Sequence, residues 1–379
     1  MKVVMANLTN GGLSGGYRNY LQKLISLLYA NNNITHIDIF VPPQTKNVVG
    51  LESYSLLSWP VKDHKKGFPW VKAKIKELAP DVVLVPTAQW IDCDKTPVVT
   101  MIRNMEPLTV PFGGNPWKEV VKNIGRAYIA KRACKKSTRV IAVSKHVKDF
   151  LHKRWGIELG KIATVYHGIE TPNMLETMPV PSCLKNEEKG QFLFTAGSIR
   201  PARGLNDIIH VLGILHTKGL NQRLVIAGGV DPGMEKYKHK LEKMSDKLGI
   251  ASQIIWAGSL SSQEMSWCYC NCSIFIMTSR AEACPNIALE AMAHGCVCIS
   301  TETSPMPEFF KDAAVYYPPK NGQALAEVIQ TVLTWDNNQR KTMSEKARKR
   351  AGEFSWDVCA EKTVAAMAKA AGIKSNRMG

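Results

Sequence analysis

Short apolar runs of strand length alternate with segments of helical periodicity through most of the chain. In the first half, the predicted strands are Lys2–Ala6, Ile37–Val41, Asp81–Val85, Val98–Ile102, Arg139–Val143 and Ile162–Tyr166. In the second half, they are Gln191–Ala196, Arg223–Ala227, Gln253–Ala257, Ser273–Met277, Val297–Ile299 and Ala313–Tyr317. Alternation of this kind is typical of parallel sheets covered by helices, so it predicts an α/β fold with two Rossmann-like domains.

A Pro-rich polar connection, residues 170–189, separates the two halves and has no sustained periodicity. We therefore expect one domain at residues 1–172 and a second at 190–355, each long enough for a core of its own. A last helix is predicted from Trp356 to about Ala371.

The formal charge of +17 is unevenly distributed. Residues 1–170 hold 25 Lys and Arg against 12 Asp and Glu, a net of +13, which leaves +4 for the remainder. An anionic partner is therefore expected for the first half. Nucleic acid, an acidic membrane face and a phosphorylated acceptor all satisfy this charge.

Neither a membrane-spanning run of about 20 apolar residues nor a signal-peptide pattern is found, so we expect a cytoplasmic protein. The ten cysteines are scattered, and several fall inside apolar strands or helices, which favours reduced thiols over disulfides. Cys268, Cys270 and Cys272 alternate on a predicted helix without a histidine at ligand spacing, which argues against a zinc site.

Glycines crowd the turn after the first strand, in residues 10–16, and a helix follows. Gly15 and Gly16 stand where backbone amides at a helix N-terminus can approach a phosphate. The spacing matches neither a dinucleotide fingerprint nor a P-loop. On these residues alone, a flexible surface loop is an equal alternative.

Two glutamates mark the loop and helix after the run Ser273–Met277. Glu282 falls beyond the carboxyl end of that strand, and Glu290 lies two turns along the next helix, which Gly295 ends. Two carboxylates placed in this way can accept hydrogen bonds from the hydroxyls of a sugar or ribose. Taken alone, this spacing is a weak signal, because two glutamates with seven residues between them are more often solvated helix charges.

Two arginines fall in the turn Gly197–Gly204 after the first strand of the second half. Arg200 and Arg203 can each bind phosphate oxygens in a bidentate manner. Taken alone, they could also be exposed surface charges.

Together these segments resemble the retaining glycosyltransferases of family 4, which have the GT-B fold of two Rossmann-like domains facing across a cleft. The resemblance covers nearly the whole chain and is strongest from Gly197 to Gly295. It also implies that the helix within residues 356–379 returns to the first domain.

The family's pattern implies a role for each matching residue in binding a nucleotide diphosphate sugar. Glu282 would contact the donor sugar and Glu290 the ribose, whereas Arg200 and Arg203 would neutralise the diphosphate. The other expected donor contacts are Gly15, Gly16, Gly197, Asn286 and Ile287. Arg203 stands where the family has lysine, and the loop after Glu282 is Ala-Cys-Pro-Asn where the family often has Gly-Phe-Gly.

The implied reaction moves a hexose from a UDP- or GDP-sugar to an acceptor hydroxyl without a metal or other cofactor. Arg103 and Asn104 lie on the acceptor side, and Arg103 replaces a histidine that is frequent in the family. The basic first domain, with the amphipathic helix 117–136 and the basic stretch 62–76, favours a lipid-linked saccharide acceptor and contact with an anionic membrane surface. The apolar face of helix 117–136 could equally pack on the core.

Other function classes fit less well. Asp92-Cys93-Asp94 has a metal-binding D-x-D form, but it stands between two predicted strands and is common by chance. No nucleic-acid-binding signature is present, so we expect no nucleic-acid partner. A basic nucleic-acid- or membrane-binding protein without transferase activity remains the alternative, as does a phosphorylase-like or epimerase-like enzyme of the same fold.

Overall fold

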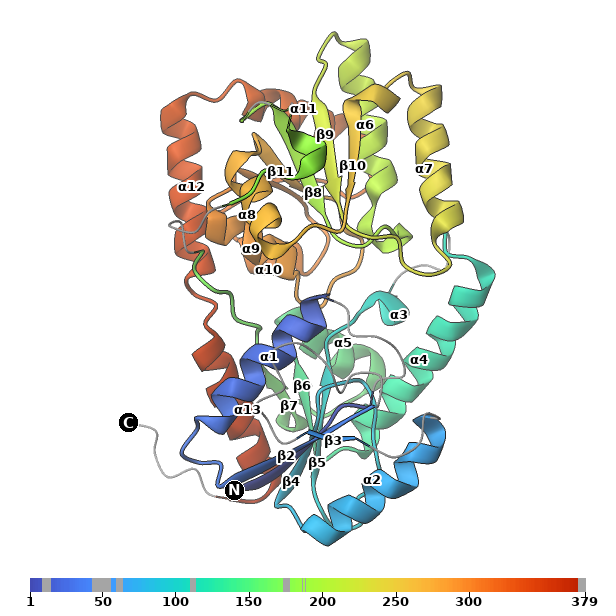
Figure 1. Ribbon diagram of the computed structural model, residues 1–379, viewed down its shortest axis with the longest axis vertical. Helices are drawn as coiled ribbons and strands as arrows, with labels where there is room; N and C mark the ends of the chain where they lie inside the picture. Colours follow the sequence, from blue (N-terminus) through green and yellow to red (C-terminus); the bar gives the residue numbers. More distant parts are fainter. Residues whose placement is uncertain are drawn as a thin grey trace. The chain divides into compact units, whose positions relative to one another are not determined.

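The computed structural model of the chain (Figure 1) describes residues 1–8, 15–42, 56–58, 64–109, 114–172, 178–185, 187 and 189–373. The residues 10–14 of the glycine-rich turn, and Lys62, lie outside this part. The chain forms two compact units, of which unit 1 comprises residues 1–105, 124–168 and 354–379, and unit 2 comprises 106–123 and 169–353. Each unit contains one parallel sheet.

The sheet of unit 1 has the strand order β3-β2-β1-β4-β5-β6-β7. Its strands are β1 (Lys2–Ala6), β2 (His36–Val41), β3 (Leu56–Ser58), β4 (Val82–Val85), β5 (Val98–Ile102), β6 (Arg139–Ala142) and β7 (Ile162–Thr164). The four central strands are almost continuously apolar and buried, because helices cover a parallel sheet on both faces. β3 is short and was not predicted.

The helices of unit 1 are α1 (Gly15–Tyr29), α2 (His64–Leu78), α5 (Lys145–Trp155) and α13 (Trp356–Ala370). α13 is the last helix of the chain, yet it packs against α1 and the sheet of unit 1. The predicted return of this helix to the first domain is therefore confirmed. Gly168 permits the contact, because a Cβ there would lie 2.2 Å from the backbone nitrogen of Trp356.

The sheet of unit 2 has the order β10-β9-β8-β11-β12-β13. Its strands are β8 (Phe192–Ala196), β9 (Arg223–Ala227), β10 (Ile254–Gly258), β11 (Ile274–Met277), β12 (Cys298–Thr301) and β13 (Val315–Tyr317). The helices are α3 (Glu106–Thr109), α6 (Leu205–Thr217), α7 (Glu235–Lys247), α8 (Ser262–Asn271), α9 (Asn286–His294), α10 (Met306–Phe310), α11 (Gly322–Leu333) and α12 (Asn337–Ala351). Helix α4 (Trp117–Lys136) has residues in both units.

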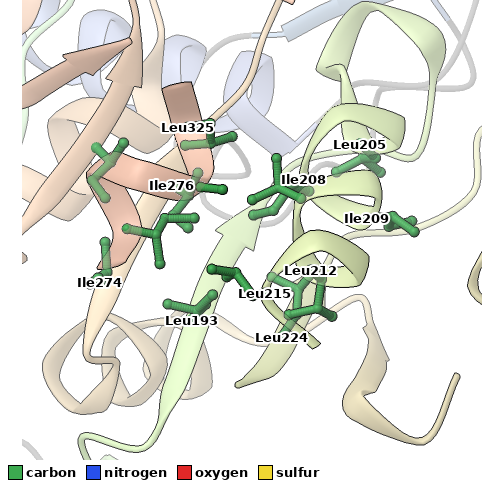
Figure 2. Packing of buried hydrophobic residues seen from close by; sticks show 14 of the residues in the cluster. Leu193, Leu205, Ile208, Ile209, Leu212, Leu215, Leu224, Ile274, Ile276 and Leu325 are labelled. Atoms are coloured by element: carbon green, nitrogen blue, oxygen red, sulfur yellow. The ribbon is translucent and has the colours of Figure 1, made fainter. Parts of the chain in front are cut away.

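The core of unit 2 lies between the sheet and helices α6 and α11. Leucine and isoleucine side chains of α6, including Ile208 and Leu212, interdigitate with those of β8, β9 and β11 (Figure 2). This apolar packing fixes where α6 begins. It therefore also fixes the turn between β8 and α6.

All ten cysteines are free thiols. Cys268 and Cys270 lie on α8, and Cys272 caps its C-terminal end. Burial raises the pKa of Cys268 to about 12, so this thiol stays protonated at neutral pH. No helix in the described part of the chain is both long and apolar enough to cross a bilayer.

Candidate active site

The candidate site of unit 2 lies where the strand order reverses. β8 is flanked by β9, which follows it in sequence, and by β11, which comes much later. Loops after two such strands diverge at the carboxyl edge of the sheet and leave space for a ligand. These loops are the turn Gly197–Gly204 and the segment from Thr278 to Pro285.

The turn Gly197–Gly204 is held close to its neighbours by glycines in backbone conformations that other residues rarely adopt. Gly197 has φ +117°, and a Cβ there would lie 2.7 Å from Nε of Arg203. Gly204 has φ +67°, and a Cβ there would lie 2.3 Å from the carbonyl oxygen of Thr278. These two glycines therefore let the arginine turn and the loop after β11 pack together.

Hydrogen bonds also join the two loops. The Thr278 hydroxyl donates to the carbonyl oxygen of Arg203 at 2.8 Å, and the backbone nitrogen of Arg280 donates to the carbonyl of Ala202 at 2.8 Å. The Arg280 guanidinium donates to Asp207 of α6, also at 2.8 Å. The positions of Arg200 and Arg203 are thus set by the backbone, as a preorganised binding site requires.

Arg200 is paired with two carboxylates. Its guanidinium forms a short ion pair with Glu106 of α3 and lies 2.5 Å from Asp231, which follows β9. The Glu106 side chain is buried, whereas that of Asp231 is partly exposed. The Nε atom of Arg200 is buried without an acceptor in the described part of the chain. The pairing of Arg200 with two carboxylates thus leaves this one donor without an acceptor among the described residues.

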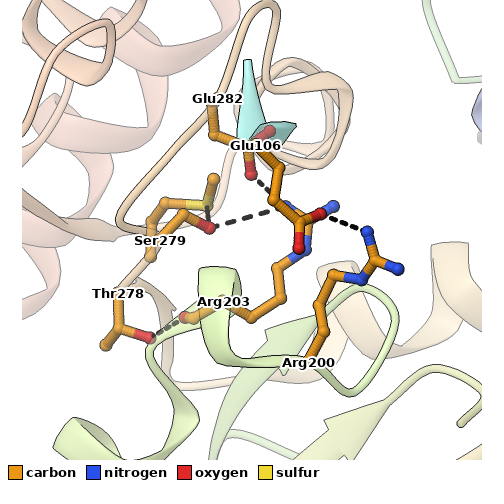
Figure 3. Close-up of polar contacts among 7 residues, drawn as sticks. Glu106, Arg200, Arg203, Thr278, Ser279 and Glu282 are labelled. Atoms are coloured by element: carbon orange, nitrogen blue, oxygen red, sulfur yellow. Dashed lines mark hydrogen bonds and ion pairs between the residues drawn. The ribbon is translucent and has the colours of Figure 1, made fainter. Parts of the chain in front are cut away.

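Arg203 is paired with Glu282. Figure 3 shows the two guanidinium groups pointing toward their acids, Arg203 toward Glu282 and Arg200 toward Glu106. Arg203 also donates to the Ser279 hydroxyl at 3.4 Å. Each arginine also acts electrostatically on the carboxylate of the other pair, so the four side chains form one charged cluster.

Burial dominates the electrostatics of these acids. It raises the pKa of Glu282 above the ordinary range, although the Arg203 charge and the Ser279 hydroxyl oppose the shift. The pKa of Glu106 is raised for the same reason, against the charges of Arg200 and Arg203. The neighbouring arginines therefore offset part of the cost of placing these carboxylates away from water.

Glu290 lies on α9 and has a different partner. Its carboxylate accepts a hydrogen bond of 2.9 Å from the Tyr269 hydroxyl of α8. Burial raises the pKa of Glu290, and the tyrosine hydrogen bond opposes this shift. Asn286 and Ile287 form the first turn of the same helix, which Gly295 ends as predicted. The two glutamates thus stand on one loop-helix segment with separate polar partners.

Four predicted site residues belong to unit 1. Gly15 and Gly16 begin α1, and Arg103 and Asn104 follow β5. The Arg103 guanidinium carbon lies 3.2 Å from the centre of the Tyr17 ring, and its Nε donates to the carbonyl of Pro86 at 3.1 Å. Burial lowers the pKa of Arg103 and raises that of Tyr17 to about 12. The described contacts of Arg103 are thus those of a packed cation.

Sequence reasoning missed Glu106, Asp231, Ser279 and Tyr269. Glu106 follows β5 by four residues and Asp231 follows β9 by four, so both stand at carboxyl ends of strands. Because ligands of parallel sheets bind beyond the carboxyl ends of the strands, this position could have marked both acids as candidate site residues. The Tyr269 contact had no signal, because it depends on how α8 packs beside α9.

In the Asp92-Cys93-Asp94 segment, both aspartates form ion pairs with one lysine. The Lys72 amine lies 3.1 Å from a carboxylate oxygen of Asp92 and 3.2 Å from one of Asp94. Within the described residues, no group of three or more His, Cys, Asp or Glu side chains is arranged to hold a metal ion.

Two family models match the chain and together cover most of it. Residues 182–350 match the model "Glycosyl transferases group 1", and residues 41–172 match "Glycosyltransferase Family 4". The first contains Arg200, Arg203, Glu282 and Glu290, and the second contains Arg103 and Asn104.

Similar curated proteins include an uncharacterized glycosyltransferase of Methanocaldococcus jannaschii, 24% identical over 60% of this chain and 59% of that protein. A serotype-specific mannosyltransferase of Escherichia coli is 24% identical over 44% of this chain and 20% of its own length. The matched region thus spans about three fifths of the first relative and one fifth of the second.

Among solved structures, Anabaena HepE in complex with UDP superposes with a TM-score of 0.72 at 16% identity. The superposition covers 97% of this chain and 100% of that chain. A likeness of this extent confirms the predicted GT-B fold.

Proposed function

The chain belongs to the GT-B glycosyltransferases of the family-4 type, and from that membership we propose that it moves a hexosyl group from a nucleoside diphosphate sugar to an acceptor hydroxyl, with retention at the anomeric carbon. The donor is a UDP- or GDP-sugar, and the acceptor is a saccharide, carried on a lipid in the synthesis of a cell-surface polysaccharide. HepE was solved with UDP, and the E. coli relative is a serotype-specific mannosyltransferase, which supports these choices.

The observation that carries the proposal is the pairing of Arg200 and Arg203 with carboxylates at the switch point of unit 2. Two guanidinium groups on one rigid turn match the charge and width of a diphosphate. A bound diphosphate would take the places of Glu106 and Glu282 on the guanidinium groups. The acids then hold the arginines in position between turnovers, which limits the reorganisation that binding requires.

In the proposed step, the bond between the anomeric carbon and the β-phosphate oxygen breaks. The acceptor oxygen forms its bond to the same face of that carbon, and the hydroxyl proton passes to the departing diphosphate. Arg200 and Arg203 stabilise the negative charge that develops on the leaving group, so the step requires no metal.

The carboxylates fix the remainder of the donor. Once Arg203 turns to the diphosphate, Glu282 is free to accept hydrogen bonds from the donor sugar. Glu290, held by Tyr269, accepts from the ribose hydroxyls. Asn286 and Ile287 support the nucleotide at the start of α9, and Gly15 and Gly16 supply backbone amides. Arg103 and Asn104 orient the acceptor.

The proposal is tested by incubating the protein with UDP- and GDP-hexoses and lipid-linked saccharide acceptors. NMR of the product should show the anomeric configuration of the donor. Arg203→Ala should slow transfer by about 10²- to 10³-fold, whereas Arg223→Ala should leave the rate of transfer unchanged. Arg223 forms an ion pair with Glu187 at the opposite edge of the same sheet, which makes it a matched control. An inverted product would contradict retention, and equal rates in wild type and Arg203→Ala would contradict the site.

A further inference from the structure

Helix α4 exposes a face of large apolar side chains and buries a face of smaller side chains. The exposed fractions are 72% for Trp117, 60% for Val121, 54% for Ile124, 69% for Tyr128 and 51% for Ile129. Four of these residues recur at i, i+4, i+7 and i+11 and therefore share one face. On another face, Asn123, Ala130 and Cys134 are buried.

This arrangement resolves an alternative that the sequence left open. The apolar stripe could have packed on the core, but the small-residue stripe does so instead. Half of the ten large hydrophobic side chains that are exposed in the described part of the chain stand on this one helix. Scattered exposed apolar residues need no explanation, whereas a contiguous stripe indicates an interaction surface.

The charges beside the stripe identify its partner. α4 carries seven basic residues and one acid. The basic residues are Lys118, Lys122, Arg126, Lys131, Arg132, Lys135 and Lys136. The acid, Glu119, lies 3.9 Å from the amine of Lys122, and its side chain is largely buried. The accessible surface of the helix is therefore apolar in the middle and cationic around it.

We propose that α4 docks on the surface of an anionic lipid bilayer, with its axis in the plane of the interface. Val121 and Ile124 would enter the apolar boundary, Trp117 and Tyr128 would lie at headgroup depth, and the lysines and arginines would contact lipid phosphates. Eight charged residues prevent the helix from spanning the bilayer, but they favour this orientation.

A second copy of the chain fits this surface less well. A two-fold symmetric contact would place the cationic border of one α4 against that of the other, and such like charges repel. The inference goes beyond the proposed function, because binding to lipid needs neither donor nor transfer. It would also place the enzyme where a lipid-linked acceptor is found.

The test is co-sedimentation of the full chain with vesicles of phosphatidylcholine alone or mixed with phosphatidylglycerol. The wild type should bind the anionic vesicles at least about tenfold more tightly, because each lysine or arginine near an anionic surface adds to binding. The double variant Ile124→Asp/Tyr128→Asp should lose that binding by a similar factor. Leu159→Asp is the matched control, since Leu159 is 49% exposed elsewhere in unit 1.

A second variant, Lys122→Glu/Lys131→Glu, keeps the stripe and should lose the preference for anionic lipid. Thermal unfolding and the response to nucleotide should be unchanged in all variants, which separates a failure of docking from a failure of the transferase proposal. Equal sedimentation of wild type and the Asp double variant would overturn the inference. So would a wild-type dimer, detected by light scattering, that the Asp double variant abolishes.

Discussion

Partly buried arginines lie in two different environments in the described part of this molecule. In unit 2, Arg200 and Arg203 face carboxylates at the carboxyl edge of the sheet. In unit 1, Arg103 stands at the corresponding edge, after β5, but lies on the Tyr17 ring and donates to the Pro86 carbonyl. A carboxylate can be replaced on an arginine by another anion, whereas an aromatic ring and a backbone carbonyl are fixed parts of the fold. Under the proposed function, the comparison predicts that Arg200 and Arg203 exchange their carboxylates for the diphosphate, whereas Arg103 keeps its contacts with the Tyr17 ring and the Pro86 carbonyl while it orients the acceptor.

The largest expected effect is on transfer. Removing Arg203 withdraws one cation from the leaving diphosphate, so Arg203→Ala should lower kcat by about 10²- to 10³-fold. Arg203→Lys keeps the charge and should retain part of the activity. Steady-state kinetics with the preferred donor measures both. Arg223→Ala is the control and should keep the wild-type kcat. If Arg203→Ala also kept the wild-type kcat, Arg203 would not differ in function from an arginine that only packs.

The second effect is on stability. Arg103→Met removes a desolvated cation from the Tyr17 ring and should lower the free energy of unfolding by about 1–2 kcal/mol. Urea denaturation measures this change. Tyr17→Phe retains the ring and should cost less. Nucleotide affinity should be unchanged in Arg103→Met, and a large loss of affinity would place Arg103 with the functional arginines instead.

The third effect is on affinity. Glu106→Gln removes an anion that competes for Arg200, while Asp231 still holds the guanidinium at 2.5 Å. The affinity for the nucleoside diphosphate should rise by up to about tenfold, which corresponds to about 1.4 kcal/mol. Calorimetric titration measures it. Weaker binding in Glu106→Gln would show that Glu106 positions Arg200 without competing with the ligand.

The smallest effect concerns Glu290, whose hydrogen-bond partner is Tyr269 rather than an arginine. Burial raises the pKa of Glu290 above its ordinary value of 4.5, so the native state keeps a proton that the unfolded chain releases. This stabilising contribution is complete below the ordinary pKa and is lost as pH rises through the raised one. Each unit of pKa shift corresponds to about 1.4 kcal/mol.

Glu290→Gln should therefore flatten the dependence of unfolding free energy on pH between the ordinary pKa and neutrality. Urea denaturation across this range measures the dependence in the variant and the wild type. An unchanged slope would mean that Glu290 titrates alike in both states.

The sequence predicted the sheets well because apolar runs bounded by polar turns are a local signal. Strand ends moved by one or two residues, as with Ile162–Tyr166, which ends at Thr164. The same periodicity located α4 at residues 117–136 but could not decide which of its faces meets the core, since that depends on distant packing. The sequence motifs predicted that Arg203 and Glu282 belong to one site, and the two side chains form an ion pair. Glu106 also stands near the carboxyl end of a strand, but it was missed because no motif connects it with Arg200, which is 94 residues away in the sequence.

The most direct test of the central claim is nucleotide binding by the turn between β8 and α6. Thermal unfolding should be followed with UDP, GDP, CMP, ADP and dTDP in wild type, Arg200→Ala, Arg203→Ala and Arg223→Ala. A ligand at 100 times its dissociation constant adds about 2.7 kcal/mol of stability. We expect UDP or GDP to stabilise the wild type and Arg223→Ala but neither of the other variants. If Arg200→Ala and Arg203→Ala respond as the wild type does, the diphosphate does not bind at this turn.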